Sequence, residues 1–505
     1  MALWTLEALG FVAAILFLLY YYFTSTFDFW RKRGVKGPKP IPFFGTFLDV
    51  FLAKDSVSDC FTHAYCNYKD EPLVGLFVGS TPLLVVNDPD LIKDVLIKDF
   101  PCFAERTLSS VDEVEPLSVH LFRLDAPRWR PLRTRLTPVF TSGKLKEMFH
   151  LLLECSDHFE SYLDKLVAKG EVIECREISA KFTTDVIGSC VFGIEMNALT
   201  AENSEFRNMG RRVFQTNWKS ALRDRARDFP FVFKIFGRFL VDHEMVKFFT
   251  RITRETVEYR IRNNVRRQDF MDSLVDLKQH PEKLGLEGKN QLDDVFMAAQ
   301  AFVFFVAGFE TSSITISNFL YELALKPSIQ DKVRAEIKEV LRKTNGVITY
   351  DCLSEMKYLD AGFQETLRKY PVVLYLSRMA LSDYTFSGTK VSIPKGTKVF
   401  VPSYGIQHDP EIFPEPEVFN PDRFTDGSAA TRHPMHFLPF GDGPRNCIGA
   451  RFAKIQTKVA AIRILSKFKV DVCEKTQVPY ILDKKSLFLL QPTHGIYVKM
   501  TKVED

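Results

Sequence analysis

The chain has 505 residues, 46% of them hydrophobic, and a formal net charge of +4. This length supplies apolar side chains for a large core, and the small net charge gives no reason to expect a nucleic-acid ligand. The nine cysteines are odd in number and include no Cys-x-x-Cys pair, which argues against a disulfide framework and favours a reducing compartment.

An apolar segment opens the chain. Residues 8–23 are apolar or aromatic apart from Gly10. With residues 1–6 they form a span whose only charged residue is Glu7, and this span is long enough to cross a membrane as one helix. No basic residues precede this segment, and Arg31, Lys32 and Arg33 follow it, a pattern that favours a retained anchor over a cleaved signal peptide. The basic flank predicts that the rest of the protein is cytosolic. The alternative is a buried core helix.

Three regions follow from this pattern. Residues 1–30 are assigned to the membrane anchor. Residues 31–45 are assigned to a basic hinge, in which closely spaced prolines make a stiff, non-helical connector. Residues 46–505 contain no internal repeat and are assigned to one large domain.

Short strands and then several helices are predicted in the first part of this domain. Residues 73–79 and 82–87 have strand patterns around a turn, and a helix is predicted from residue 88 to about residue 100. Further helices are predicted over residues 144–169, 176–192, 205–222 and 241–263, with residues 260–267 as a solvated helix face.

A tryptophan and an arginine with helical spacing lie between these elements. Trp129 and Arg133 are four residues apart and therefore share one face of a helix. An indole N–H and a guanidinium both suit a carboxylate ligand. By themselves they are a weak signal, because any surface helix can carry such a pair.

A long helix predicted over residues 292–326 is the first stretch with a chemical pattern. Residues 298–307 are apolar on all sides, which predicts a helix through a core. Glu310 and Thr311 follow, and an ionisable group there is costly unless it is paired or functional. The Thr311 hydroxyl can both donate and accept a hydrogen bond, and the neighbouring Glu310 carboxylate can pass protons to a ligand held there. Gly308 is expected to leave space for a small ligand. The alternative is a kinked core helix with a paired glutamate.

The most informative stretch is Phe-Leu-Pro-Phe-Gly-Asp-Gly-Pro-Arg-Asn-Cys-Ile-Gly-Ala-Arg, residues 437–451. Apolar residues then recur at helical spacing, so Cys447 lies at or just before a helix N-terminus, which favours a thiolate. Gly441 and Gly443 let the backbone turn tightly beside a flat, bulky group. Arg445 adds a permanent cation near the sulfur. A single thiolate suits haem iron better than zinc.

This stretch carries a specific resemblance. Phe440, Gly443, Arg445, Cys447 and Gly449 fill the pattern Phe-x-x-Gly-x-Arg-x-Cys-x-Gly at every fixed position. The segment resembles the haem-binding loop of the cytochrome P450 family, and the resemblance extends over the chain after the hinge. It is closest to insect microsomal members that handle toxins and plant compounds. It implies a mainly α fold with a smaller β-rich part.

The resemblance implies roles for further residues. Glu310 and Thr311 match the Ala-Gly-x-Glu-Thr motif of the family's oxygen-activating helix. Glu365, Arg368 and Arg423 match a Glu-Arg-Arg cluster, to which we assign a structural role beside the haem loop. The residues expected at the haem or its propionates are Arg106, Trp129, Arg133, Arg378, Phe440, Gly443, Arg445 and Gly449.

The implied activity is that of a haem-thiolate monooxygenase with haem b, in which Cys447 is the axial iron ligand. One oxygen atom of O2 would enter an apolar small molecule such as a xenobiotic, plant toxin, insecticide or endogenous lipophile. Five bulky apolar residues either shape its pocket or belong to the core: Phe214, Phe302, Phe304, Phe305 and Leu374.

The electrons are expected to come from a partner, because the sequence has no nucleotide-binding fingerprint and no iron–sulfur cysteine cluster. The resemblance implies NADPH–cytochrome P450 reductase, with cytochrome b5 as a second donor, at the endoplasmic reticulum membrane. Cations that can steer an acidic partner are Arg128, Arg130, Lys144, Lys146, Arg451 and Lys454.

Three alternatives remain open at this stage. A thiolate-haem isomerase or dehydratase would rearrange peroxides without a reductase, but it would not need the proton relay of Glu310 and Thr311. A non-enzymatic haem sensor would show no substrate-stimulated NADPH use. A membrane-tethered structural protein would purify without colour.

Overall fold

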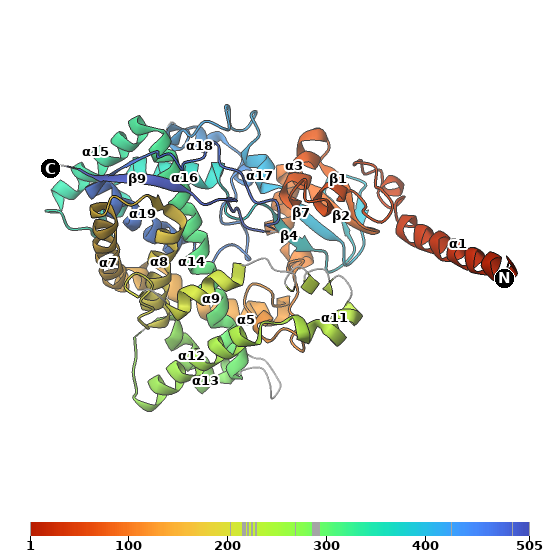
Figure 1. Ribbon diagram of the computed structural model, residues 1–505, viewed down its shortest axis with the longest axis horizontal. Helices are drawn as coiled ribbons and strands as arrows, with labels where there is room; N and C mark the ends of the chain where they lie inside the picture. The colour runs from red at the N-terminus through yellow and green to blue at the C-terminus, as the bar shows by residue number, and fades with distance from the viewer. Residues whose placement is uncertain are drawn as a thin grey trace.

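The protein is seen in a computed structural model, in which helices form the larger part and the main sheet lies beside the N-terminal helix (Figure 1). The structure describes residues 2–201, 204–214, 219, 222–223, 226–227, 230–267, 269–284, 293–425, 427–486 and 488–503. This architecture confirms the mainly α fold with a smaller β-rich part.

The largest sheet has four strands in the order β1-β2-β7-β4. β1 (Leu73–Val78) and β2 (Thr81–Val86) form the predicted antiparallel hairpin, in which Leu76 faces Leu83. β7 (Lys398–Val401) pairs in parallel with β2, and β4 (Leu376–Met379) pairs antiparallel with β7. The remaining strands are β3 (Ile173–Glu174), β9 (Tyr497–Lys502) and β8 (Phe468–Asp471) in one sheet, and β5 (Tyr384–Thr385) and β6 (Ser392–Ile393) in a hairpin.

Helices make up most of the remaining described secondary structure. They are α1 (Ala2–Thr24), α2 (Leu48–Phe51), α3 (Val57–Asn67), α4 (Pro89–Lys93), α5 (Ala126–Leu136), α6 (Ser142–Glu147), α7 (Phe149–Ala168), α8 (Cys175–Ile187), α9 (Glu205–Phe214), α11 (Pro230–Phe236), α12 (His243–Arg262), α13 (Phe270–Gln279), α14 (Asp294–Leu325), α15 (Pro327–Lys343), α16 (Lys357–Lys369), α17 (Ser403–Gln407), α18 (Ser428–Thr431) and α19 (Ala450–Lys467).

The N-terminal helix α1 extends away from the body of the protein (Figure 1), and its described apolar side chains are exposed almost to its end. The chain joins the folded body soon after α1. Trp30 is 3% exposed, and its ring fills the place of a side chain at Gly75, where a Cβ would lie 2.3 Å from it. The hinge then follows β1 without forming an α-helix, and Lys36 bridges to Val74.

The long helix predicted through the core is α14. The side chain of Asp293 accepts a hydrogen bond from the Phe296 N–H, which caps the helix start. By length and composition α14 is the one described helix that would pass as a membrane span, but most of it is buried inside the protein, and the apolar part of α1, Leu9–Thr24, is shorter.

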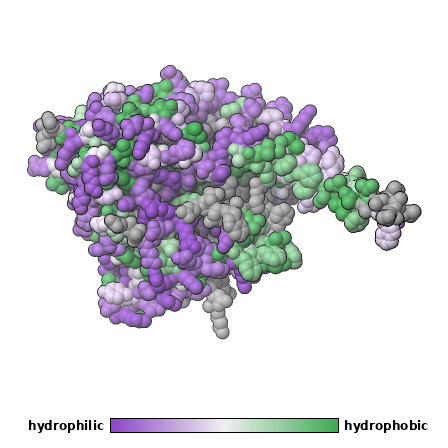
Figure 2. Space-filling view, in the orientation of Figure 1, coloured by the Kyte–Doolittle hydropathy of each residue, from purple (hydrophilic) through white to green (hydrophobic). Residues whose placement is uncertain are grey.

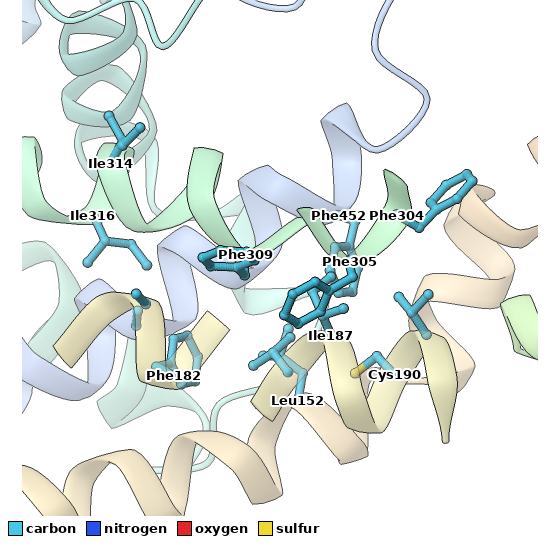
Figure 3. Packing of buried hydrophobic residues seen from close by; sticks show 14 of the residues in the cluster. Leu152, Phe182, Ile187, Cys190, Phe304, Phe305, Phe309, Ile314, Ile316 and Phe452 are labelled. Carbon is cyan, nitrogen blue, oxygen red and sulfur yellow. The ribbon is translucent and has the colours of Figure 1, made fainter. Parts of the chain in front are cut away.

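α14 packs closely on α8. Figure 3 shows Phe305 and Phe309 of α14 near Ile187 and Phe182 of α8. A Cβ on Gly308 would lie 2.2 Å from Cδ1 of Ile187. The expectation that Gly308 leaves space for a small ligand is therefore wrong on this side, because Ile187 fills the space and brings the two helices together.

Other expectations need correction. Arg260 is 3% exposed and pairs with Asp269 and Asp272 at 2.6 and 2.7 Å, so it is a buried ion-pair centre and not part of a solvated face. In the tail, strand β9 begins only at Tyr497 and ends at Lys502, whereas strands were expected around residues 480–499. The helix expected over residues 205–222 includes α9, but residues 215–218 and 220–221 lie outside the described part.

Candidate active site

Two glycines with left-handed backbone shape the loop that carries Cys447. Gly441 and Gly443 have φ of 66° and 73°, a region that residues with a Cβ rarely adopt. A Cβ on Gly443 would lie 1.9 Å from the carbonyl oxygen of Leu96. The Cys447 N–H donates to the Phe440 carbonyl over 2.9 Å, which closes the loop.

The helix predicted after the cysteine is α19, with Gly449 as its N-cap. The exposed surface of the Cys447 thiol faces a cavity of about 2560 Å³. Burial raises the pKa of this thiol, whereas the Gly449 N–H and the guanidinium groups of Arg133 and Arg106 lower it. Burial outweighs the helix start, so the thiolate expected at Cys447 depends on metal coordination, which deprotonates a thiol.

α14 brings Thr311 to the same cavity. Thr311 lines it together with Ala307 and Gly308, and the Thr311 hydroxyl donates to the Ala307 carbonyl over 2.7 Å. Glu310 does not line the cavity; it is 3% exposed and forms an ion pair with Arg176 of α8. The two neighbouring residues therefore differ in surroundings, with the hydroxyl at the cavity and the carboxylate paired in the core.

Four arginines line the cavity near Cys447: Arg106, Arg133, Arg378 and Arg445. None of them forms an ion pair with an acidic side chain in the described part of the chain. Burial lowers the pKa of Arg378 to about 10, and burial followed by the charge of Arg378 lowers the pKa of Arg445 to about 9. Buried like charges are costly without an anion to neutralise them. This cluster therefore indicates an anionic ligand.

Backbone carbonyls fix Arg445 from within the protein. Its guanidinium donates to the carbonyls of Ala104 and Leu124 over 2.9 and 2.8 Å and lies 4.2 Å from the ring centroid of Trp129. Arg106 in turn donates to the carbonyl of Arg445 over 2.8 Å. The loop of Cys447 is thus tied to the segment that follows β2 and to α5.

Arg133 and Arg378 complete the cluster. Arg133 donates to the carbonyl and to Oδ1 of Asn446, both over 2.9 Å, so it is oriented by the residue next to Cys447. Arg378 is 4% exposed, and its Nε is buried with no hydrogen-bond partner in the described protein. A buried donor without a partner is costly and suggests that a ligand atom satisfies it.

Comparisons with known proteins identify this arrangement. The family model described as "Cytochrome P450" matches residues 35–500. The chain belongs to the cytochrome P450 family. Cytochrome P450 6B1 of Papilio polyxenes is 39% identical to this P450 over 98% of the chain and 100% of its own length. Cytochrome P450 6a2 of Drosophila melanogaster is 39% identical over 97% of the chain and 98% of its own length. Cytochrome P450 6j1 of Blattella germanica is 38% identical over 96% of the chain and 96% of its own length.

Family membership makes this P450 a monooxygenase of the oxidoreductase class, with a haem iron bound by a cysteine thiolate. The residues present fit that group. A thiol faces a large cavity, cations without acidic partners lie beside it, and Arg378 has a buried donor to spare for a propionate. A Cβ on Gly449 would meet no atom within 4 Å, which leaves the cavity side of the loop open.

The Glu-Arg-Arg residues are brought together in a buried cluster in this P450. Glu365 and Arg368 of α16 are 0% exposed and form hydrogen bonds of 2.7 and 2.9 Å, and Nε of Arg423 lies 3.4 Å from Glu365. Arg368 also donates to the Gln407 carbonyl over 3.1 Å, and the Leu438 N–H donates to Gln407 Oε1 over 3.3 Å. The cluster therefore connects α16 with the start of the cysteine loop.

The five apolar residues considered for the pocket divide between the cavity and the core. Phe214, Phe302 and Phe304 line the cavity, and Phe305 and Leu374 do not. Phe305 is fully buried and packs against Phe309 and other rings of the core. Periodicity alone could not separate these two sets, because α14 is apolar on all sides.

Most of the cations considered for partner docking have acidic partners. The pairs are Arg128 with Asp112 and Asp125, Lys144 with Glu147, Lys146 with Asp351, and Lys454 with Asp360. Arg130 and Arg451 are exposed and form no ion pair with any acidic side chain that the structure describes.

Sequence reasoning missed two partners of the predicted site residues. Asn446 holds Arg133, and its place between Arg445 and Cys447 in the loop was the only signal that could have drawn attention to it. Arg176 pairs with Glu310 across two helices far apart in sequence. No local pattern marks such a partner, because the contact is created by helix packing.

Proposed function

We propose that this P450 inserts one oxygen atom of O2 into apolar small molecules, namely xenobiotics, plant toxins, insecticides or endogenous lipophilic compounds, with electrons from NADPH supplied through a reductase. The observation that carries the proposal is one cavity lined by Cys447, Thr311, four arginines and aromatic side chains. Its apolar walls suit lipophilic substrates, because such sites bury most of a ligand's apolar surface.

Within this proposal, Cys447 would hold haem through its iron, and haem would supply the activation of dioxygen. Arg378, Arg445, Arg106 and Arg133 would hold the propionates, and Trp129 supports Arg445. Phe440, Gly443 and Gly449 would let the loop backbone approach a bound haem. Charge-assisted hydrogen bonds of this kind orient a carboxylate strongly.

Thr311 and Glu310 handle protons in this proposal. The Thr311 hydroxyl holds a proton at the cavity wall, next to the place where oxygen is reduced. Glu310 is placed in the proton path as the carboxylate next to Thr311. Its partner Arg176 keeps its own proton but brings the ion pair to the surface, because the Arg176 side chain is 23% exposed whereas that of Glu310 is 4% exposed. The aromatic walls exclude other water, which limits release of reduced oxygen as peroxide.

The electron donor is proposed to be a membrane-bound NADPH–cytochrome P450 reductase, with cytochrome b5 as a second donor. The chain has no nucleotide-binding fingerprint of its own. Arg130 and Arg451 are the docking cations that we favour, because ion pairs within the protein already neutralise the other candidates.

The proposed location is the endoplasmic reticulum membrane, with residues 1–30 as anchor, residues 31–45 as hinge and residues 46–505 as a cytosolic catalytic domain. The exposed apolar side chains of α1 support this proposal. Figure 2 shows further hydrophobic surface at the base of α1 and over α11 on the same side of the molecule. Its exposed residues are Ile41, Phe43, Phe51, Leu52, Phe231, Ile235, Phe236 and Phe239. Such a patch suits a lipid surface.

The test is reconstitution of the holoenzyme with reductase, NADPH and a panel of apolar compounds, with product and NADPH consumption both measured. The proposal requires hydroxylated product that depends on NADPH and O2. Product formed from peroxide without NADPH would favour the isomerase or dehydratase alternative. A haem-loaded protein without substrate-stimulated NADPH use would favour a sensor.

A further inference from the structure

Five consecutive carbonyls of α14 accept hydrogen bonds from side chains. Three donors come from α14 itself: Thr311 to Ala307, Ser313 to Glu310, and Thr315 to Thr311, over 2.7, 2.8 and 3.0 Å. Hydroxyl groups that bond back to carbonyls of the preceding turn weaken and bend a helix. The turn that carries Thr311 therefore depends on outside contacts for its geometry.

Two other helices supply those contacts. Thr183 of α8 lies 2.9 Å from the Phe309 carbonyl, but its single hydroxyl proton is shared with the Ser179 carbonyl at the same distance. Gln456 of α19 donates from Nε2 to the Gly308 carbonyl over 3.2 Å and also hydrogen-bonds Ser312 Oγ. An amide has two N–H groups, so Gln456 makes both contacts without sharing a proton.

The orientation of the Gln456 amide is fixed by its surroundings. Only an N–H can face the Gly308 carbonyl, so Oε1 must point elsewhere. This Oε1 is buried with no hydrogen-bond partner in the described protein, while the Gln456 side chain is 0% exposed. A buried acceptor without a partner destabilises the fold. The sequence nevertheless places an amide here, which indicates that the Nε2 contacts matter.

The position of Gln456 along α19 gives these contacts a consequence. α19 begins at Ala450, directly after the Cys447 loop, so Gln456 is linked to Cys447 by less than two turns of regular helix. Gln456, Gly308, Ser312 and Cys447 all line the same cavity. The amide therefore joins the helix of the cysteine to the turn of Thr311 by a short, rigid route.

We propose that Gln456 is a positioning residue that fixes the 308–312 turn of α14 relative to Cys447, and so keeps electron use coupled to product formation. This inference rests on the proposed roles of Cys447 and Thr311. Gln456 performs no chemical step. It determines where the Thr311 hydroxyl lies, and a misplaced hydroxyl allows reduced oxygen to leave as peroxide before the substrate reacts.

The test compares Gln456→Met with the wild type as reconstituted holoenzymes. Peroxide released per NADPH consumed is expected to rise about two- to tenfold, the effect of losing one positioning hydrogen bond. Amide hydrogen exchange in the peptide covering residues 305–315 is expected to accelerate. The reduced, carbon monoxide-bound spectrum is expected to stay unchanged, because Cys447 is untouched.

Gln330→Met is the matched control. Gln330 is also a fully buried glutamine that donates between elements, to the carbonyls of Leu323 and Val470 over 3.0 and 2.7 Å, and it does not line the cavity. It is expected to lose stability without raising peroxide or exchange in residues 305–315. Wild-type coupling and exchange in Gln456→Met, or equal uncoupling in the Gln330→Met control, would overturn the proposal.

Gln456→Glu keeps the test decisive if Gln456→Met does not load haem. A carboxylate cannot donate to the Gly308 carbonyl, but a carboxylic acid can. Burial raises the pKa of a carboxyl group, so the protonated form is accessible at mildly acidic pH. The excess of peroxide over wild type is expected to shrink as pH falls. A pH-independent excess, or none, contradicts the proposal.

Failure of this inference can be separated from failure of the proposed function. A thiolate-type spectrum and NADPH-dependent product in the wild type, together with normal Gln456 variants, would remove only the positioning role. A wild-type protein without that spectrum would remove the roles of Cys447 and Thr311 themselves.

Discussion

At the scale of single residues, what distinguishes this site is the number of polar groups that the chain leaves unsatisfied around one cavity. The Nε of Arg378 is buried without a partner, and neither Arg378 nor the three arginines beside it form an ion pair with an acidic side chain in the described protein. Proteins rarely leave such groups uncompensated, because each one costs stability. The arginines and Cys447 therefore fit a ligand that carries both a metal ion and carboxylates.

Cys447→His is expected to abolish monooxygenation, because an imidazole donates less electron density than a thiolate. Some haem is expected to remain bound, since the arginines are unchanged. Product formation and haem content of the purified variant check this expectation. Full activity in Cys447→His would contradict the assignment of Cys447.

Thr311→Ala is expected to increase the share of NADPH that ends as peroxide by about two- to tenfold, because the cavity loses its hydroxyl. Peroxide and product are measured together during turnover. Ser317→Ala is the control, since Ser317 also lies on α14 and donates to the carbonyl four residues earlier, over 2.6 Å, but it does not line the cavity. Unchanged coupling in Thr311→Ala would take Thr311 out of the proton path.

At the scale of elements, the cysteine loop and the buried Glu365 cluster show how distant segments are locked together. The loop contacts the carbonyl of Leu96 through Gly443, and the cluster connects α16 to the loop through Gln407. Both connections join residues far apart in sequence. Each connection can be tested by substituting one of its residues and comparing the variant with the same substitution at a site that lacks the connection.

Gly443→Ala is expected to destabilise the protein by more than the roughly 1–2 kcal/mol that a left-handed alanine costs, because its Cβ would also meet the Leu96 carbonyl at 1.9 Å. Gly388→Ala provides the comparison, since Gly388 has a similar φ of 71° and open space around it. Unfolding midpoints and haem content of both variants decide the matter. Equal effects would show that close packing at Gly443 is unimportant.

Glu365→Gln is expected to lower the free energy of unfolding by about 3–5 kcal/mol, because it removes the counter-charge that Glu365 provides to the fully buried Arg368. Urea unfolding measures the effect. Glu339→Gln removes the partner of an exposed arginine, Arg342, and is expected to leave the midpoint unchanged. A mild effect of Glu365→Gln would mean that the cluster does not stabilise the loop region.

The sequence predicted most elements and the cysteine loop, because both depend on local signals. Hydrophobic periodicity marked α14, and fixed glycine, arginine and cysteine positions marked the loop. Contacts between helices carry no such signal, so the pairing of Glu310 with Arg176 and the burial of Arg260 were not foreseen. The space beside Gly308 was misread for the same reason, since Ile187 comes from another helix.

At the scale of the whole molecule, a folded body with a large cavity carries one exposed apolar helix at its end (Figure 1). Hydrophobic surface near the base of that helix lies on the same side (Figure 2). This distribution agrees with the proposed anchoring at a membrane surface. The buried core begins after this helix, at Trp30, although Phe23 at the end of α1 already contacts Phe43.

Deletion of residues 2–24 is expected to leave haem binding and the unfolding midpoint unchanged and to weaken membrane binding. The deletion stops before Trp30, whose Nε1 donates to the Leu76 carbonyl over 3.0 Å in the core. Sedimentation with lipid vesicles measures the change. The deletion variant is then compared with one that also carries Phe231→Ser and Phe239→Ser. If only the second variant loses its remaining vesicle binding, that binding is due to the patch over α11. Unchanged vesicle binding in both variants would contradict the membrane-facing surface.

The central claim is that Cys447 binds haem iron as a thiolate, and the absorption spectrum of the reduced protein with and without carbon monoxide tests it most directly. The account predicts a strongly red-shifted Soret band, which requires a thiolate on the opposite side of the iron. A folded, haem-loaded protein whose band lies at the position typical of histidine-ligated haem would contradict it.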